Sequence, residues 1–197
     1  MTDTQKKPLW KNELVWLFLI TSGLFAILYS KFILGGYAYV FTDTGADTMQ
    51  INYAQYGLFS SLFRSGESGY VLQAGLGMDV SSYYPAYLIP YNLLILLAPQ
   101  RLLPWAVLAS AYLKMITISL VGYLFYRKLM QDGIGTMAAA LAWTFSGYVI
   151  LWGQHYGFCT CMALFTVFMY FLQCYLNGEQ RWKSAGLVIT VTMLLIS

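Results

Sequence analysis

Long stretches of apolar residues alternate with short polar segments along most of this chain. Four stretches, at residues 14–34, 102–126, 133–151 and 157–176, are long enough to cross a bilayer, and a fifth begins at Ser184. A membrane-spanning helix needs about 20 mainly apolar residues, because in lipid its backbone polar groups must bond within the helix. The pattern therefore predicts an all-α polytopic membrane protein.

The fifth stretch, residues 184–197, stops before it is long enough to span. A natural protein rarely stops inside a span, so we expect these 197 residues to be the N-terminal part of a longer protein. Residues 1–13 precede the first span, and residues 35–101 form a long segment between the first span and the second. That long segment, rich in glycine, tyrosine and proline, is where we expect the chemistry to lie.

Composition agrees with a bilayer environment. The chain is 59% hydrophobic and only 10% charged, whereas an average soluble domain has roughly 25% charged residues. The net charge of +3 comes from short clusters beside the spans, which indicates a topology signal and no nucleic-acid partner. Cys159, Cys161 and Cys174 lie in or beside one apolar stretch, where we interpret them as small packing residues.

The basic residues predict the direction in which each span crosses. They form three groups, namely Lys6, Lys7 and Lys11, then Arg127 and Lys128, then Arg181 and Lys183. Short loops rich in lysine and arginine stay in the cytoplasm, so all three groups should face it, including the N-terminus. The segments at 35–101 and 154–156 then lie on the outer face.

This topology requires that residues 85–98 do not cross the membrane. The segment is short and contains Pro90, with Pro99 following, so we interpret it as a juxtamembrane helix. In the alternative, residues 85–98 do cross, the later loops invert, and His155 becomes cytoplasmic.

An amphipathic helix is predicted within the outer segment. Residues 44–47 fit the S/T-x-x-D/E pattern of a helix start, and apolar residues follow at helical spacing from Ile51 to Leu62. Asp47 would lie in the first turn, where the helix dipole favours an ionised carboxylate. From spacing alone Asp47 either caps the helix or serves as a proton acceptor. The many tyrosines of the segment, Tyr53 and Tyr56 among them, are typical of an interfacial aromatic belt, with sugar stacking as the alternative.

Several short motifs follow one another after the first span. They are Gly-Ala-Asp-Thr-Met-Gln at residues 45–50, Tyr-Ala-Gln-Tyr at 53–56, Gly-Leu-Gly-Met-Asp at 75–79 and Tyr-Pro-Ala-Tyr-Leu-Ile-Pro-Tyr-Asn at 84–92. In this order they resemble the YfhO family of bacterial membrane proteins, which belongs with the GT-C glycosyltransferases. The resemblance covers the chain from the first span to the fourth.

The resemblance implies a GT-C-like N-terminal helical bundle with juxtamembrane helices in the first outer loop and a key aspartate close after the first span. Asp47 matches that position best, so the resemblance favours a catalytic role over capping. It implies transfer of a sugar from a polyprenyl-phosphate donor to a cell-surface polymer such as lipoteichoic acid, at the outer face of the bacterial plasma membrane. One departure is that residues 154–158 contain no acidic residue, whereas many relatives carry one in the second outer loop.

Glycosyl transfer needs a base that takes the proton of the acceptor hydroxyl, and Asp47 is the candidate. No second carboxylate is placed as a nucleophile, so the reaction should invert the anomeric centre. Asp43 could help to hold a divalent cation such as Mg²⁺ or Mn²⁺, but two carboxylates are too few to assign a metal.

Four further residues are candidates for substrate binding. Arg64 and His155 could contact the leaving phosphate, although an interfacial arginine usually pairs with lipid headgroups and a lone histidine is often structural. Gln50 belongs to the motif that contains Asp47. Lys114 lies near the middle of the second span, where a charge is a functional hypothesis by default, and pairing with a further part of the protein is the alternative.

Two other classes of protein fit the same pattern. A transporter or lipid flippase would also place charges within spans and use broken helices. A membrane scaffold without catalytic activity is favoured if no cavity leads to Asp47.

Overall fold

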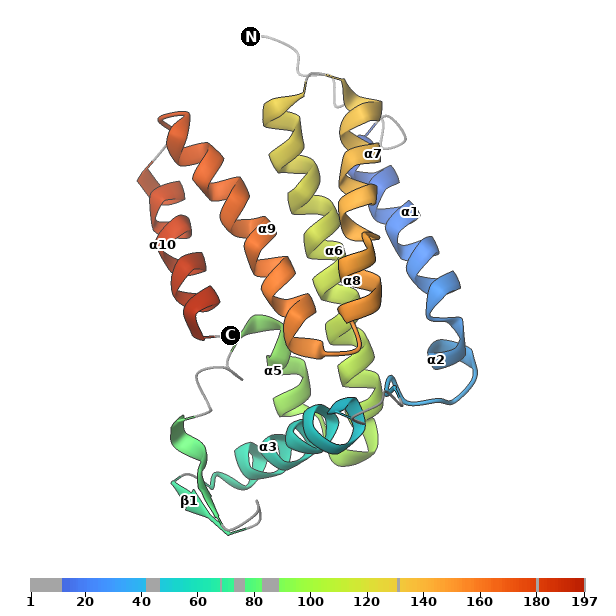
Figure 1. Ribbon diagram of the computed structural model, residues 1–197, viewed down its shortest axis with the longest axis vertical. Helices are drawn as coiled ribbons and strands as arrows, with labels where there is room; N and C mark the ends of the chain where they lie inside the picture. Colours follow the sequence, from blue (N-terminus) through green and yellow to red (C-terminus); the bar gives the residue numbers. More distant parts are fainter. Residues whose placement is uncertain are drawn as a thin grey trace, which may run out of the picture.

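The computed structural model describes residues 12–41, 47–67, 69–72, 77–82, 89–130, 132–179 and 181–196. These residues are mostly helical. Five long rods run side by side in Figure 1: α1 (Glu13–Leu28), α6 (Leu103–Leu129), α7 (Gly133–Thr144) continued by α8 (Gly147–Trp152), α9 (Tyr156–Leu176) and α10 (Arg181–Ile196). The basic N-terminal residues, Asp43 and residues 85–88 lie outside the described part of the chain.

Three helical segments are long and apolar enough to cross a membrane within the described ranges. They are Gln100–Leu129, Gly133–Trp152 and Tyr156–Leu176, and they correspond to the second, third and fourth predicted spans. Asp132 caps the second of them, because its carboxylate accepts hydrogen bonds from the backbone N–H groups of Ile134 and Gly135.

The first predicted span, residues 14–34, is divided into two helices. α1 ends at Leu28, and α2 (Ser30–Leu34) begins after Tyr29, whose φ of −102° and ψ of 17° interrupt the helix. α1 is 16 residues long and therefore falls just short of the length required of a span. Two hydrogen bonds attach it to α6, one between the hydroxyls of Thr21 and Ser119 at 2.7 Å and one between those of Ser22 and Tyr112 at 2.8 Å.

The predicted outer segment lies across one end of the rods. It contains the π-helix η2 (Thr48–Tyr53), which runs directly into α3 (Ala54–Ser65), and the shorter helix α5 (Pro90–Leu97) (Figure 1). Two 3-10 turns, η3 (Val80–Ser82) and η4 (Gln100–Leu102), and the antiparallel pair β1 (Tyr70–Val71) and β2 (Met78–Asp79) complete the described elements.

α5 packs within the protein against α3 and α6. Ile95 and Leu96 are fully buried, and the Ser60 hydroxyl of α3 donates a 2.7 Å hydrogen bond to the carbonyl of Ala98 just after α5. Pro90 stands in the first turn of α5, where its missing N–H costs no helical hydrogen bond. At eight residues α5 is about 12 Å long, well short of the roughly 30 Å hydrocarbon core.

Most of the buried apolar side chains gather at the end of the bundle where α3 and α5 lie. Phe59, Ile95 and Ile118 are fully buried there, whereas a much smaller cluster around Leu17 and Tyr123 lies toward the other end. Tyr56, predicted as part of an interfacial belt, belongs to the large cluster and is 7% exposed. The crosswise helices are therefore firmly packed onto the end of the rods.

Candidate functional site

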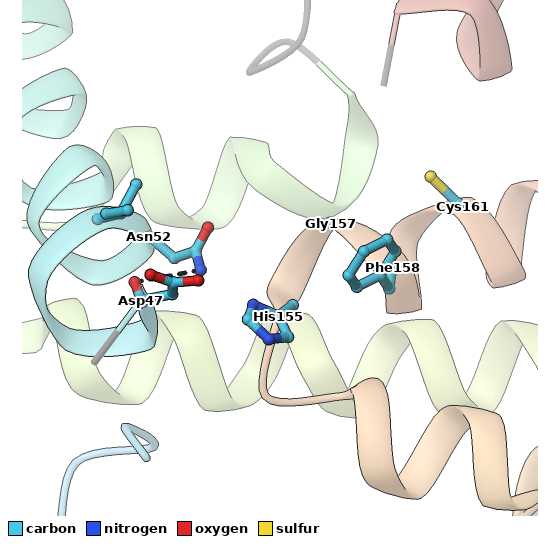
Figure 2. Close-up of a pocket in the computed structure, with 7 residues that line it drawn as sticks. Asp47, Asn52, His155, Gly157, Phe158 and Cys161 are labelled. Carbon is cyan, nitrogen blue, oxygen red and sulfur yellow. Dashed lines mark hydrogen bonds between the residues drawn. The ribbon is translucent and has the colours of Figure 1, made fainter. Parts of the chain in front are cut away.

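A pocket of about 330 Å³ opens between the start of η2 and the start of α9. Its lining residues are Asp47, Ile51 and Asn52 on one side and His155, Gly157, Phe158 and Cys161 on the other. Figure 2 shows Asp47 and Asn52 on one wall with the His155 ring facing them from the other. Segments about a hundred residues apart in the sequence thus meet at one polar pocket.

The η2 wall places Asp47 at the pocket through an unusual helical turn. η2 is a π-helix, a wider turn that is rare and is often found at functional sites. Asp47 precedes its first residue, and its side chain makes no capping hydrogen bond to the helix. Asn52, one turn further on, donates a 3.3 Å hydrogen bond to the backbone carbonyl of Asp47 (Figure 2).

The α9 wall begins at His155, which precedes the first residue of that helix in an extended conformation. The imidazole ring packs against Trp152 and Phe158, with ring centroids 5.7 and 5.6 Å away. Both aromatic side chains are nearly half exposed. A Cβ atom added at Gly157 would meet no atom within 4 Å, so the absence of a side chain there keeps the pocket open.

Two direct contacts hold the walls together beside the pocket. The Thr48 hydroxyl, next to Asp47, donates a 3.2 Å hydrogen bond to the carbonyl of Gln154, next to His155. The Tyr56 ring of α3 stacks on the Tyr156 ring of α9, with centroids 5.3 Å apart and planes 12° apart. Thr48 and Gln154, the chain neighbours of Asp47 and His155, are thus in direct contact.

A loop residue supports the α9 wall from the other side. The Tyr39 hydroxyl donates a 3.3 Å hydrogen bond to the carbonyl of Gly153, two residues before His155. Burial raises the pKa of Tyr39 well above its ordinary value, so its phenol keeps the proton that it donates.

The remaining predicted site residues lie away from this pocket. Gln50 is on η2 but exposed, and Arg64 is exposed in the last turn of α3. Lys114 is buried inside the bundle as the sequence predicts, and it lies behind the pocket, where its ammonium donates a 3.1 Å hydrogen bond to the carbonyl of Tyr156. Asp43 lies outside the described residues, so the structure places only Asp47 and His155 together.

Sequence reasoning did not identify Asn52, Gly157, Phe158 or Cys161 as pocket residues. Asn52 sits among the apolar positions of a predicted amphipathic helix, and a polar residue in that stretch is a signal that could have been used. The others follow His155 at helical spacing, but only the packing of η2 against the α9 start shows which face of α9 they line.

The sequence alone does not assign a metal site. In the part of the chain that the structure describes, no group of three or more His, Cys, Asp or Glu side chains is arranged to hold a metal ion. Independently of any metal, the polar side chains of Asp47, Asn52 and His155 in the pocket can form hydrogen bonds, and the carboxylate and the imidazole can exchange protons.

Comparisons with known proteins found no relative of the chain. No protein family, curated protein or solved structure matches the chain.

Proposed function

We propose that this is a multi-pass protein of the bacterial plasma membrane, with its N-terminus in the cytoplasm. The support is the three apolar helices together with the position of the basic residues. Lys128 at the end of α6 and Lys183 at the start of α10 lie at the end of the bundle opposite α3 and the start of α9 (Figure 1), and the pocket is lined by residues at the start of η2 and of α9. Under the positive-inside rule that end is cytoplasmic, so the pocket opens at the outer face.

We further propose that the pocket is the active site of a GT-C-type glycosyltransferase. It would move a sugar from a polyprenyl-phosphate donor to a cell-surface glycopolymer such as lipoteichoic acid. The observation that carries this proposal is that Asp47 and His155 line one open pocket between the start of η2 and the start of α9. The resemblance of the outer-loop motifs to the YfhO family agrees with it.

In this proposal Asp47 is the general base. Its carboxylate takes the proton of the acceptor hydroxyl as the oxygen attacks the anomeric carbon, and the bond from that carbon to the phosphate breaks. One carboxylate at the pocket suits direct displacement, which inverts the anomeric centre. His155 and Asn52 offer hydrogen bonds to the departing phosphate or to the sugar, and Ile51 and Phe158 supply apolar surface beside them.

The test is sugar transfer by the purified full-length protein and its Asp47→Asn variant. Asparagine keeps the size of the side chain but cannot accept the proton, and loss of a general base lowers rates by about 100-fold to 10,000-fold. Asparagine and aspartate are equally favourable at the start of a helix, so we expect the variant to fold as the native protein does. The control is Asp79→Asn in β2, which removes an exposed carboxylate away from the pocket and should leave transfer unchanged. Undiminished transfer by Asp47→Asn would exclude Asp47 as the base.

A transporter or flippase is the second candidate function, because one candidate span is broken. α7 ends at Thr144 and α8 begins at Gly147, and between them the Ser146 hydroxyl is buried with no hydrogen-bond partner among the residues that the structure describes. Broken helices of this kind form substrate sites in many transporters. Movement of a lipid-linked sugar across vesicle membranes, unaffected by Asp47→Asn, would favour this candidate.

A further inference from the structure

The ammonium group of Lys114 is buried in the middle of α6, and burial of a charged group costs free energy. The lysine side chain is 2% exposed, and its ammonium donates to the carbonyl of Tyr156 at 3.1 Å. No carboxylate among the described residues forms an ion pair with it. The same carbonyl also accepts a 3.1 Å hydrogen bond from the Thr160 hydroxyl, so two side chains converge on the first turn of α9.

Tyr156 is the residue through which this contact reaches the pocket. Its ring lies between two others, with centroids 5.8 Å from Tyr39 and 5.3 Å from Tyr56, and its hydroxyl donates to the backbone carbonyl of Tyr39. Tyr56 belongs to α3, which continues η2 without a break, so Tyr156 joins the helix that follows Asp47 to the start of α9.

Lys114 and Tyr156 therefore lie directly behind the residues that line the pocket, toward the interior of the bundle. Tyr156 lies between His155 and Gly157 in the chain, and both of these line the pocket. Its backbone is fixed to α6 by Lys114, and its side chain is fixed to the Tyr39 loop and to α3. We propose that Lys114 and Tyr156 are positioning residues, which together set the place of His155 opposite Asp47.

Packing alone does not account for a lysine at this position. An apolar side chain of similar length would fill the same space without burying an ammonium group, so the lysine contributes its N–H donors and its charge. The donor fixes the Tyr156 carbonyl, and the charge strengthens that hydrogen bond in an apolar interior. This positioning role rests on the proposed function of the pocket, but the contacts themselves can be tested without any activity.

His155 is the only histidine of the chain, and this makes a direct test possible. Full-length protein labelled with ¹⁵N-histidine and purified without a histidine tag reports on this one imidazole, provided that any further histidine is substituted. A fixed ring gives one sharp set of imidazole resonances. A ring whose backbone support is lost samples several positions and gives split or broadened resonances.

Four variants separate the possible causes. Lys114→Met removes donor and charge at similar length and should lose the single sharp resonance, whereas Lys114→Arg keeps both and should retain it. Lys128→Met is the matched control, because it makes the same substitution in the same helix about 21 Å away and should leave the spectrum unchanged. Tyr156→Phe keeps the ring but removes its hydrogen bond to Tyr39, and it too should split or broaden the signal.

The native single resonance in both Lys114→Met and Tyr156→Phe would overturn the positioning role. Should Lys114→Met fail to fold, Tyr156→Phe decides alone, since it leaves the buried lysine in place. Transfer activity is a separate readout: we expect Lys114→Met to lower kcat with little change in KM. If the spectra change as expected while Asp47→Asn transfers sugar normally, the positioning role stands and the proposed function fails.

Discussion

Thr48 connects the two walls of the pocket through a single side chain. It is fully buried next to Asp47, and its hydroxyl reaches the carbonyl of Gln154 on the other wall. Its other neighbour in the chain is exposed Met49, so the polypeptide passes from the interior to the surface within two residues. A single hydroxyl therefore fixes the start of η2 against the loop before α9.

We predict that Thr48→Val destabilises the protein by about 1 kcal/mol, the usual net value of one hydrogen bond. Valine keeps the shape of threonine, so the change isolates the loss of the hydroxyl. Reversible unfolding in mixed detergent and SDS measures the effect. Thr192→Val is the control, because Thr192 is exposed and its hydroxyl only bonds to Val188 of its own helix. Equal stability of Thr48→Val and the native protein would show that the contact does not join the walls.

At the scale of elements, one acidic residue links α6 to α10. The Glu179 carboxylate, in the turn between α9 and α10, accepts hydrogen bonds from Lys128 of α6 and from Lys183 of α10. The Lys128 ammonium also lies 5.6 Å from the centre of the Tyr170 ring. These contacts tie three helices together at the end of the bundle away from the pocket.

The hydrogen bonds from Lys128 and Lys183 lower the pKa of Glu179 from 4.5 to about 2. Because the folded-state pKa is depressed, the stabilisation is present above about pH 4.5 and is lost as the pH falls toward 2. We predict that the difference in Tm between the native protein and Glu179→Gln is largest near neutral pH and shrinks over this window. Thr192→Val, a change at an exposed residue that does not titrate, is the control and should show no such trend. A difference in Tm that stays constant down to about pH 2 would show that the ionised Glu179 carboxylate does not stabilise the fold through Lys128 and Lys183.

Among the secondary-structure features, the sequence predicted the breaks within helices least well. Tyr29 interrupts the first apolar stretch and Phe145 ends α7, yet neither position carries the proline that would signal a break. Apolar composition predicts where a helix can cross lipid, but tertiary packing decides where it bends. The start of η2 near Asp47 was predicted from the pattern, whereas its π-helical geometry was not.

At the scale of the whole molecule, α3 and the start of α9 lie at one end of the bundle, and the end of α6 with Arg127 and Lys128 and the start of α10 lie at the other (Figure 1). The predicted topology placed residues 35–101 and 154–156 on one face, and Asp47 and His155 meet at one pocket in the fold. The other residues that line the pocket are selected by the packing of α9 against η2. The hydrophobic periodicity of the sequence does not determine this packing. Tyr56 illustrates this, because an aromatic belt and a buried stack have the same sequence signature.

The orientation in the membrane is tested by cysteine labelling in a background without Cys159, Cys161 and Cys174. We predict that a membrane-impermeant maleimide applied to intact cells reaches Gln50→Cys but does not reach Asn177→Cys. Both positions are exposed, and they lie at opposite ends of the bundle. Asn177→Cys should react once the cells are permeabilised. Equal labelling of both positions in intact cells would contradict the orientation.

If the pocket between η2 and α9 binds a lipid-linked sugar, as proposed, Gly157→Leu should block that binding. A leucine side chain would fill the open space beside His155 and Phe158, while a leucine in a helix costs no stability relative to glycine. The measurement is the Kd of a polyprenyl-phosphate sugar for the purified full-length protein. We predict saturable binding by the native protein and by Asp47→Asn, weakened at least about tenfold, or 1.4 kcal/mol, in Gly157→Leu. Gly157→Ala should bind almost as well as the native protein. The same Kd for Gly157→Leu and the native protein would show that the sugar does not bind in this pocket.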